Sequence, residues 1–218
     1  MIYSNKRRLY LSGWFQKHHP VSYNIPIKFH KFLILYEMMC KVLNQEYDFS
    51  NLEGWANGPI FSSVWGDYSK DRYEFDKLAL IELALKSFNI NEEIAKKCAF
   101  IVDSISSDEL IEIVHQLNIW KAKEDEIVSN TYRLSLDEKD FNEADQSLIM
   151  NLYNMYSVDL IDNSKVFQIN EKYFVFNKDQ YDLLTKEHKE ILQELSLNKD
   201  LINPVFVEID SDGGLLID

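Results

Sequence analysis

Residues 27–44 carry the feature that most limits the fold, an apolar stripe at helical spacing. The recurrence at three and four residues matches one buried face of an α-helix, and Pro26 precedes it, where the first turn of a helix tolerates proline. The stripe consists of Phe29, Phe32, Leu33, Tyr36, Cys40 and Leu43. Only 6 Gly and 4 Pro occur among the 218 residues, which argues against a turn-dense β-sandwich or barrel. The sequence therefore predicts a mainly α fold.

Helix caps predict further helices along the chain. Asn91 is placed to cap a helix whose first turn holds two acidic residues, Glu92 and Glu93, which are favourable there. Ser106 and Glu109 have the spacing of a capping box. Helical periodicity also predicts helices over residues 60–68, 75–87 and 178–196, and Asn142 is placed to cap another.

Two short β-rich runs in the last quarter of the chain predict a hairpin. Val166–Ile169 and Tyr173–Phe176 flank the short segment 170–172. The run VFVEI predicts one further strand, followed by an acidic tail that we expect to fray. Residues 1–25 are expected to be irregular or extended, and residues 47–60 to form a loop, because turn-forming residues gather there.

The charged stretch 121–140, which has little apolar periodicity, indicates either a domain boundary, the interpretation that we favour, or helix ends on a surface. We therefore expect a helical domain over residues 1–125, with segment 1–25 as its extended N-terminal part. Residues 126–218 are expected to form a C-terminal α+β extension made of a helix, a hairpin and a helix. The predicted fold class is mainly α, with the short β-hairpin confined to this extension.

The charge distribution narrows the classes of partner. The chain has 23 Lys and Arg against 36 Asp and Glu, a net charge of −13. Residues 1–47 have a net charge of +5, so the remaining 171 residues carry −18. An acidic body repels a phosphate backbone and attracts a basic protein. We therefore expect a protein partner and no nucleic acid, and the run Lys6-Arg7-Arg8 is expected to be a solvated end.

The sequence also predicts a location. It has no run of about 18 apolar residues that would predict a transmembrane helix, and its first residues lack the pattern of a signal peptide. Cys40 and Cys98 belong to no C-x-x-C pair and lie on apolar helical faces, so we expect unpaired core residues. Such cysteine use is typical of the cytoplasm. We expect no membrane association and a cytoplasmic location.

No catalytic or metal-binding pattern is found in the sequence. It lacks glycine-rich phosphate loops, an H-E-x-x-H helix and a G-x-S-x-G turn. His18 and His19 are adjacent, so in a strand their side chains would point to opposite faces. His188 lies on an apolar stripe and is expected to be a core or edge residue. We predict no metal, no cofactor and no catalytic residue.

The segment 51–61 is the most distinctive part of the chain. It combines Trp55 with an Asn57-Gly58 turn and Pro59, and Trp65 follows shortly after. Two interpretations are open at this point. The loop could plug the core with its tryptophans, or it could form a stiff aromatic surface that docks a protein.

Three motifs resemble the Panacea domain family of SocA-like antitoxins and phage-associated proteins. Ile27–Tyr36 (IKFHKFLILY) is similar to the family's first helix, K-L-Q-K-L-L-Y. Glu53–Ile60 (EGWANGPI) is similar in order and spacing to its loop E-A-W-x-x-G-P-V. Leu110–Trp120 (LIEIVHQLNIW) is similar to L-S-x-L-T-H-x-E-x-P-W and keeps the Leu, the His and the Trp at matching offsets.

The chain departs from the family pattern at Gly54, Val114, Leu117 and Ile119. The resemblance covers residues 25–125 and leaves residues 126–218 unexplained. It implies a mainly helical domain that neutralises a toxin by direct protein binding or, as in one relative, an adaptor that presents its toxin to a protease. No catalytic residues are established for the family, so none are carried over.

The predicted function is that of an antitoxin-like or phage-accessory protein that binds a protein partner, such as a cognate toxin or host protein, and neutralises it by steric occlusion. The candidate binding and signature residues are Tyr36, Glu53, Trp55, Asn57, Gly58, Pro59, Trp65, His115 and Trp120.

Two alternatives stay open. One is an enzyme with a polar pocket that holds His115, Glu53 and Asn57 between the Trp55 loop and the His115 helix. Against it, we favour a structural hydrogen bond for His115, because no nucleophile or second titratable group is in evidence. The other alternative is a phage or host-interaction protein that acts through residues 126–218.

Overall fold

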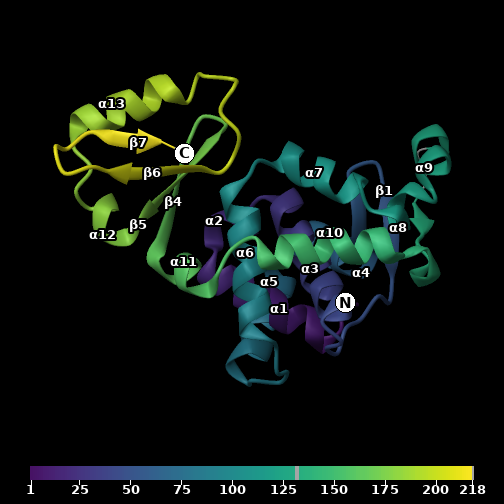
Figure 1. The fold of residues 1–218 in the computed structure, drawn as a ribbon. Coiled ribbons are helices and arrows are strands. Elements are labelled where there is room, and N and C mark those ends of the chain that lie inside the picture. The colour runs from purple at the N-terminus through teal and green to yellow at the C-terminus, as the bar shows by residue number, and fades with distance from the viewer. Residues whose placement is uncertain (131–132, 218) are drawn as a thin grey trace.

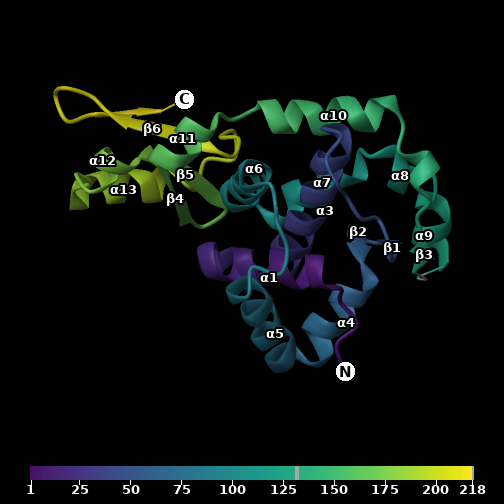
Figure 2. The ribbon, with the colours of Figure 1, turned by 90° about the horizontal axis from the view of Figure 1, so that it is seen from below.

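Figure 1 shows the computed structural model, which describes residues 1–130 and 133–217. A helical body (residues 6–154) makes up most of the molecule, and a smaller C-terminal unit (residues 158–217) lies at one end of it (Figures 1 and 2). The prediction of a mainly α fold with additional strands is confirmed.

The helical body contains helices and one small sheet. Its helices are α1 (Lys6–His18), α2 (Pro20–Tyr23), α3 (Pro26–Val42), α4 (Ser62–Lys70), α5 (Arg72–Ala84), α6 (Glu92–Ser104), α7 (Ser107–His115), α8 (Asn118–Lys121), α9 (Glu124–Asn130), the short 3₁₀ helix η1 (Glu138–Asp140) and α10 (Glu143–Asn154). Its strands are β1 (Leu52–Trp55), β2 (Gly58–Phe61) and β3 (Leu134–Ser135). The predicted caps at Asn91, Ser106 and Asn142 are confirmed.

Helix α3 forms the centre of the body. Every residue from Lys28 to Cys40 is buried, so the helix is enclosed on all sides rather than along one stripe. Helices α1, α6, α7 and α10 and the β1–β2 hairpin pack around it. Cys40 and Cys98 are both buried and free, as predicted. Within the described ranges, no helix combines the length and the apolar character needed to cross a membrane.

The N-terminal segment is helical, so the prediction of an extended segment over residues 1–25 is wrong. Asn5 begins α1 by accepting a hydrogen bond from the backbone N–H of Arg8. The buried face of α1 includes Arg7, Arg8 and Ser12 among its apolar residues. Because polar side chains interrupt that face, the segment has no apolar stripe that could reveal the helix.

Helix α1 packs along α5, and a glycine sets the distance between them. A Cβ atom on Gly13 would overlap the backbone carbonyl of Ala79. The two helices therefore approach more closely here than any residue with a side chain would allow.

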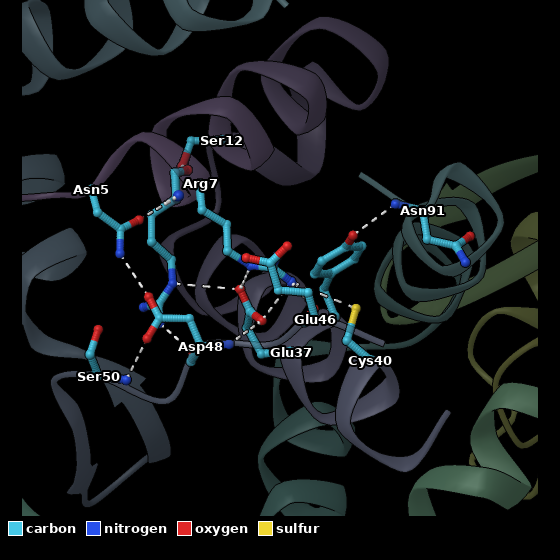
Figure 3. Close-up of polar contacts among 11 residues, drawn as sticks. Asn5, Arg7, Ser12, Glu37, Cys40, Glu46, Asp48, Ser50 and Asn91 are labelled. Carbon is cyan, nitrogen blue, oxygen red and sulfur yellow. Dashed lines mark hydrogen bonds and ion pairs between the residues drawn. The ribbon is translucent and has the colours of Figure 1, made fainter. Parts of the chain in front are cut away.

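Arg7 and Arg8 lie in a buried ionic network, so the prediction of a solvated end is wrong (Figure 3). Arg7 forms two bonds with Glu37, from Nε to Oε1 at 2.7 Å and from Nη2 to Oε2 at 2.9 Å. Arg8 Nε lies 3.7 Å from the same carboxylate, and Arg8 Nη2 donates to the carbonyl oxygen of Asp48 at 2.6 Å. The fully buried Glu37 carboxylate thus compensates two guanidinium groups.

The segment predicted as a loop over residues 47–60 forms a β-hairpin in its second half. In the antiparallel pairing of β1 and β2, Trp55 lies opposite Gly58, so Ala56 and Asn57 form a two-residue turn. β3 pairs with the other side of β1, giving the strand order β2-β1-β3. Glycine and Pro59, which are typical of loops, lie inside these strands and hide them in the sequence.

The C-terminal unit is built on a four-stranded sheet in the order β4-β5-β6-β7. Its elements are α11 (Val158–Asn163), β4 (Ser164–Ile169), β5 (Lys172–Asn177), α12 (Lys178–Tyr181), α13 (Lys186–Leu195), β6 (Val205–Ile209) and β7 (Leu215–Ile217). β4 and β5 form the predicted hairpin. β6 runs parallel to β5 and β7 antiparallel to β6. A separate small core contains Phe174, Phe176, Leu192, Val205 and Val207.

Two predictions in this unit are wrong. The helix predicted over residues 178–196 is divided into α12 and α13, because Thr185 begins α13 in a capping box with His188. The tail that was expected to fray pairs with β6 as β7 instead. The Asp210 carboxylate holds the intervening turn by accepting a hydrogen bond from the backbone N–H of Gly214 at 2.7 Å.

The boundary between the two hydrophobic cores lies further along the chain than the charged stretch 121–140 predicts. Phe141, Ile149 and Leu152 all belong to the core of the helical body. Residues 134–154 are therefore packed with the body, although the sequence places them in the C-terminal extension. Figure 2 shows α10 running along the body toward α11 and the C-terminal sheet.

Candidate functional site

The β1–β2 hairpin is fixed to the helical body by side chains from α3, α7 and α8. Trp120 Nε1 donates a hydrogen bond to the carbonyl oxygen of Trp55 at 2.9 Å. Lys31 Nζ donates to the carbonyl oxygen of Pro59 at 3.0 Å. The loop and the two helices that carry the family-like motifs therefore form one assembly, as the sequence interpretation requires.

His115 supplies a third attachment. Its Nε2 lies 3.0 Å from the carbonyl oxygen of Ala56, and its ring stacks on Trp120 with the centroids 3.9 Å apart. Burial lowers the pKa of this imidazole, which favours the neutral ring. His115 thus makes the structural hydrogen bond that we favoured from the sequence.

Gly58 lets the hairpin lie directly on α7. Its φ of 90° falls in a region that side chains disfavour. A Cβ atom there would overlap Cγ2 of Val114 and lie 3.2 Å from Lys31 Nζ. Both the backbone conformation and the contact with α7 therefore require glycine at this position.

Two half-buried tryptophans meet at the hairpin, Trp55 at the end of β1 and Trp65 on α4. The rings of Trp55 and Trp65 meet edge to face, with centroids 5.4 Å apart. Trp55 Nε1 donates to Glu53 Oε2 at 3.1 Å, and the Arg133 guanidinium lies 4.2 Å from the Trp55 ring centroid. Each ring is held in place by its neighbours while part of it contacts solvent.

All but one of the candidate residues lie on the hairpin or against it. Asn57 is exposed in the turn, while Gly58, Pro59 and Trp120 are buried beneath it. Tyr36 lies elsewhere on α3, where its hydroxyl accepts a hydrogen bond from the backbone N–H of Asn91 at the start of α6. Tyr36 is therefore a core residue and not part of this surface.

Sequence reasoning missed two buried polar residues of α3: Lys31, which bonds the hairpin, and His30, whose ring centroid lies 5.2 Å from that of Trp65. Burial lowers the pKa of the Lys31 ammonium to about 7. Burial, assisted by the charge of Lys31, lowers the pKa of His30 to about 3, and neither ring nitrogen has a hydrogen-bond partner among the described residues. Their presence within the most apolar helix was the available signal, because polar residues are uncommon there.

Replacing Lys31 with Met should flatten the pH dependence of stability above neutrality. In the unfolded chain a lysine binds its proton up to a pKa near ~10.4, whereas the folded protein releases it near pH 7. Between these values the unfolded state holds more protons, so stability rises with pH by up to about 1.4 kcal/mol per pH unit for this group. Denaturant titrations of both proteins at pH 7.5 and 9.5 measure the slope, and equal slopes would contradict the burial argument.

The groups of the enzyme hypothesis make their hydrogen bonds with other residues. His115 contacts the carbonyl oxygen of Ala56, and Glu53 contacts the indole of Trp55. Among the described residues no hydrogen bond joins His115, Glu53 and Asn57 to one another. Residues 1–130 and 133–217 also contain no group of three His, Cys, Asp or Glu side chains placed to hold a metal ion.

The chain was compared with known protein families, curated proteins and solved structures. No family model matches the chain, and no curated protein or solved structure matches it significantly. The resemblance to the Panacea family therefore stays a prediction that depends on the three motifs.

Proposed function

We propose that this chain is an antitoxin-like or phage-accessory protein that binds a protein partner and neutralises it by steric occlusion. The partner would contact the hairpin surface, which we define as Glu53, Trp55, Ala56, Asn57 and Trp65. The observation that carries the proposal is the attachment of this surface to α3, α7 and α8 through Lys31, His115 and Trp120.

Rigid attachment matters because binding is opposed by the loss of conformational freedom. A surface that is already ordered loses little on association, so more of the contact energy appears as affinity. Tryptophans that are fixed and partly exposed are the side chains that most often dominate a protein interface. Trp55 and Trp65 meet both conditions, since each ring packs against the other at 5.4 Å.

Charge supports a basic partner. The net charge of −13 gives the molecule a field that attracts positively charged surfaces over several ångströms. Such a field acts mainly on the association rate, whereas buried aromatic contacts act mainly on dissociation. We therefore expect association with the partner to slow as salt is added.

Asn57→Arg should weaken partner binding at least tenfold without unfolding the protein. Asn57 is exposed in the hairpin turn and does not require a positive φ, so arginine fits the fold. The added bulk and positive charge oppose a basic partner at the centre of the hairpin surface. The association and dissociation rate constants are measured with the product of the neighbouring gene as the partner. A growth assay then tests whether the variant still rescues cells from the toxicity of that product.

Tyr73→Arg is the matched control, because Tyr73 is 81% exposed on α5, outside the hairpin surface. It adds the same charge at an exposed aromatic, and binding should stay within twofold of the wild type. Loss of binding in the Tyr73 variant but not in the Asn57 variant would place the interface on α5 instead. Absence of any complex and any rescue with the neighbouring gene products would reject the proposed function.

A further inference from the structure

A hollow of about 350 Å³ lies where the helical body meets the C-terminal unit. Helices α1, α2, α3 and α6 form one wall, and strands β4 and β5 form the other. The lining is mainly apolar, with Val21 and Ile25 on the first wall and Val166 and Phe167 on the second. The volume and the apolar lining with a few polar groups are typical of sites for small molecules.

One polar group in the lining is the ammonium of a buried lysine, Lys28. Lys28 is only 2% exposed, and its Nζ lies 4.1 Å from the ring centroid of Tyr173. Among the described residues its amino group has neither a hydrogen bond nor an ion pair. Burial lowers the pKa of Lys28 to about 8 against the opposing effect of two carboxylates, so most of it is charged at pH 7. A buried charge normally has a partner of opposite sign.

Asp103 and Glu109 are the two carboxylates whose charge raises the pKa of Lys28. Both accept hydrogen bonds from other residues. Asp103 lies 2.6 Å from His19 Nδ1 and accepts a bond from Ser22 Oγ at 2.5 Å. Glu109 accepts the backbone N–H of the capping box at 2.6 Å and the amide of Asn203 at 3.0 Å. Lys28 thus lines the hollow while no carboxylate of the described part of the chain forms an ion pair with its ammonium.

We propose that this hollow binds a small organic anion, a carboxylate on a flat apolar body. The carboxylate would pair with Lys28 Nζ and the apolar body would lie against Val166, Phe167 and Tyr173. A carboxylate supplies the counter-charge for the Lys28 ammonium, and the side chains of Val166, Phe167 and Tyr173 offer an apolar and aromatic wall to a ring system. The site is distinct from the hairpin surface and does not depend on the function proposed for it.

Isothermal titration with 2-naphthoate tests the site, with 2-naphthylmethanol as the neutral analogue and inorganic phosphate as an anion without an apolar body. The wild-type protein should bind one naphthoate at least tenfold more tightly than either of the other probes. Lys28→Met should weaken naphthoate binding at least tenfold. Lys31→Met is the matched control, because Lys31 is also buried on α3 but lies outside the hollow. This variant should bind naphthoate within twofold of the wild-type affinity.

A second variant keeps Lys28 and fills the hollow instead. Val166→Trp places a ring in the hollow and should also weaken naphthoate binding at least tenfold, so the proposal is testable even where Lys28→Met fails to fold. Thermal unfolding identifies variants that have lost the native structure. The proposal is overturned if folded wild-type protein does not bind naphthoate, if the alcohol binds equally well, or if folded variants of Lys28 and Val166 both keep wild-type affinity.

Discussion

Glu37→Gln should lower the free energy of unfolding by about 3–5 kcal/mol. The Glu37 carboxylate is fully buried and accepts hydrogen bonds from Nε and Nη2 of Arg7 at 2.7 and 2.9 Å. It also lies 3.7 Å from Arg8, whose side chain is only 1% exposed and whose other carboxylate neighbour, Asp48, lies 3.5 Å away. An amide keeps the size of the side chain but leaves two buried guanidinium groups without their shared counter-charge. Denaturant-induced unfolding followed by circular dichroism measures the loss.

Glu46→Gln provides the control for this experiment. Glu46 takes part in the same network only through its backbone carbonyl, which accepts a bond from Arg7 at 2.7 Å, and its side chain is exposed. Its substitution should change the unfolding free energy by less than about 0.5 kcal/mol. Similar small effects for Glu37 and Glu46 would mean that the buried charges are compensated in another way.

Gly58→Ala should lower the free energy of unfolding by about 2–5 kcal/mol. Part of the loss is the strain of a side chain at positive φ, which amounts to about 1–2 kcal/mol. The rest is overlap with Val114 on α7, and overpacking of this kind costs about 1–3 kcal/mol. Because Gly58 holds the hairpin against α7, the loosened hairpin should also exchange its backbone amide protons faster than in the wild type.

A second glycine separates the two contributions. Gly213 has a φ of 81°, close to the 90° of Gly58, but open space surrounds the position of its Cβ atom. Gly213→Ala should therefore show the strain alone, about 1–2 kcal/mol. Combining Gly58→Ala with Val114→Ala should cost less than the sum of the single changes, because the second change removes the overlap. Strict additivity would show that contact with Val114 is not the cause.

Features encoded by neighbouring residues were predictable. Asn91, Ser106 and Asn142 cap helices in the structure as expected, because a cap depends only on the next three residues. The β4–β5 hairpin followed from two β-rich runs separated by a short turn. For the site, the order and spacing of the motifs predicted that the Trp55 loop lies with the segment that carries His115 and Trp120, and both side chains contact it.

Features that depend on distant partners were not predictable. Helix α1 has a polar inner face whose buried arginines bond residues far along the chain, chiefly Glu37, thirty positions from Arg7, and Asp48. The strands of the hairpin contain Gly58 and Pro59, which are typical of loops. Glycine is required at position 58 because a Cβ atom there would overlap Val114 on α7. Lys31 resembles a surface residue in the sequence, and only its carbonyl partner at Pro59 explains its burial.

The strand order β2-β1-β3 has a consequence for biosynthesis. One edge of β1 is covered by β3, whose residues emerge from the ribosome long after Glu53 and Gly54, with which they pair. Contacts between segments far apart in the chain form slowly. Until then the nascent hairpin exposes unpaired backbone groups that another chain can join. Chaperone capture during translation of residues 62–133 would therefore raise the yield of monomeric protein.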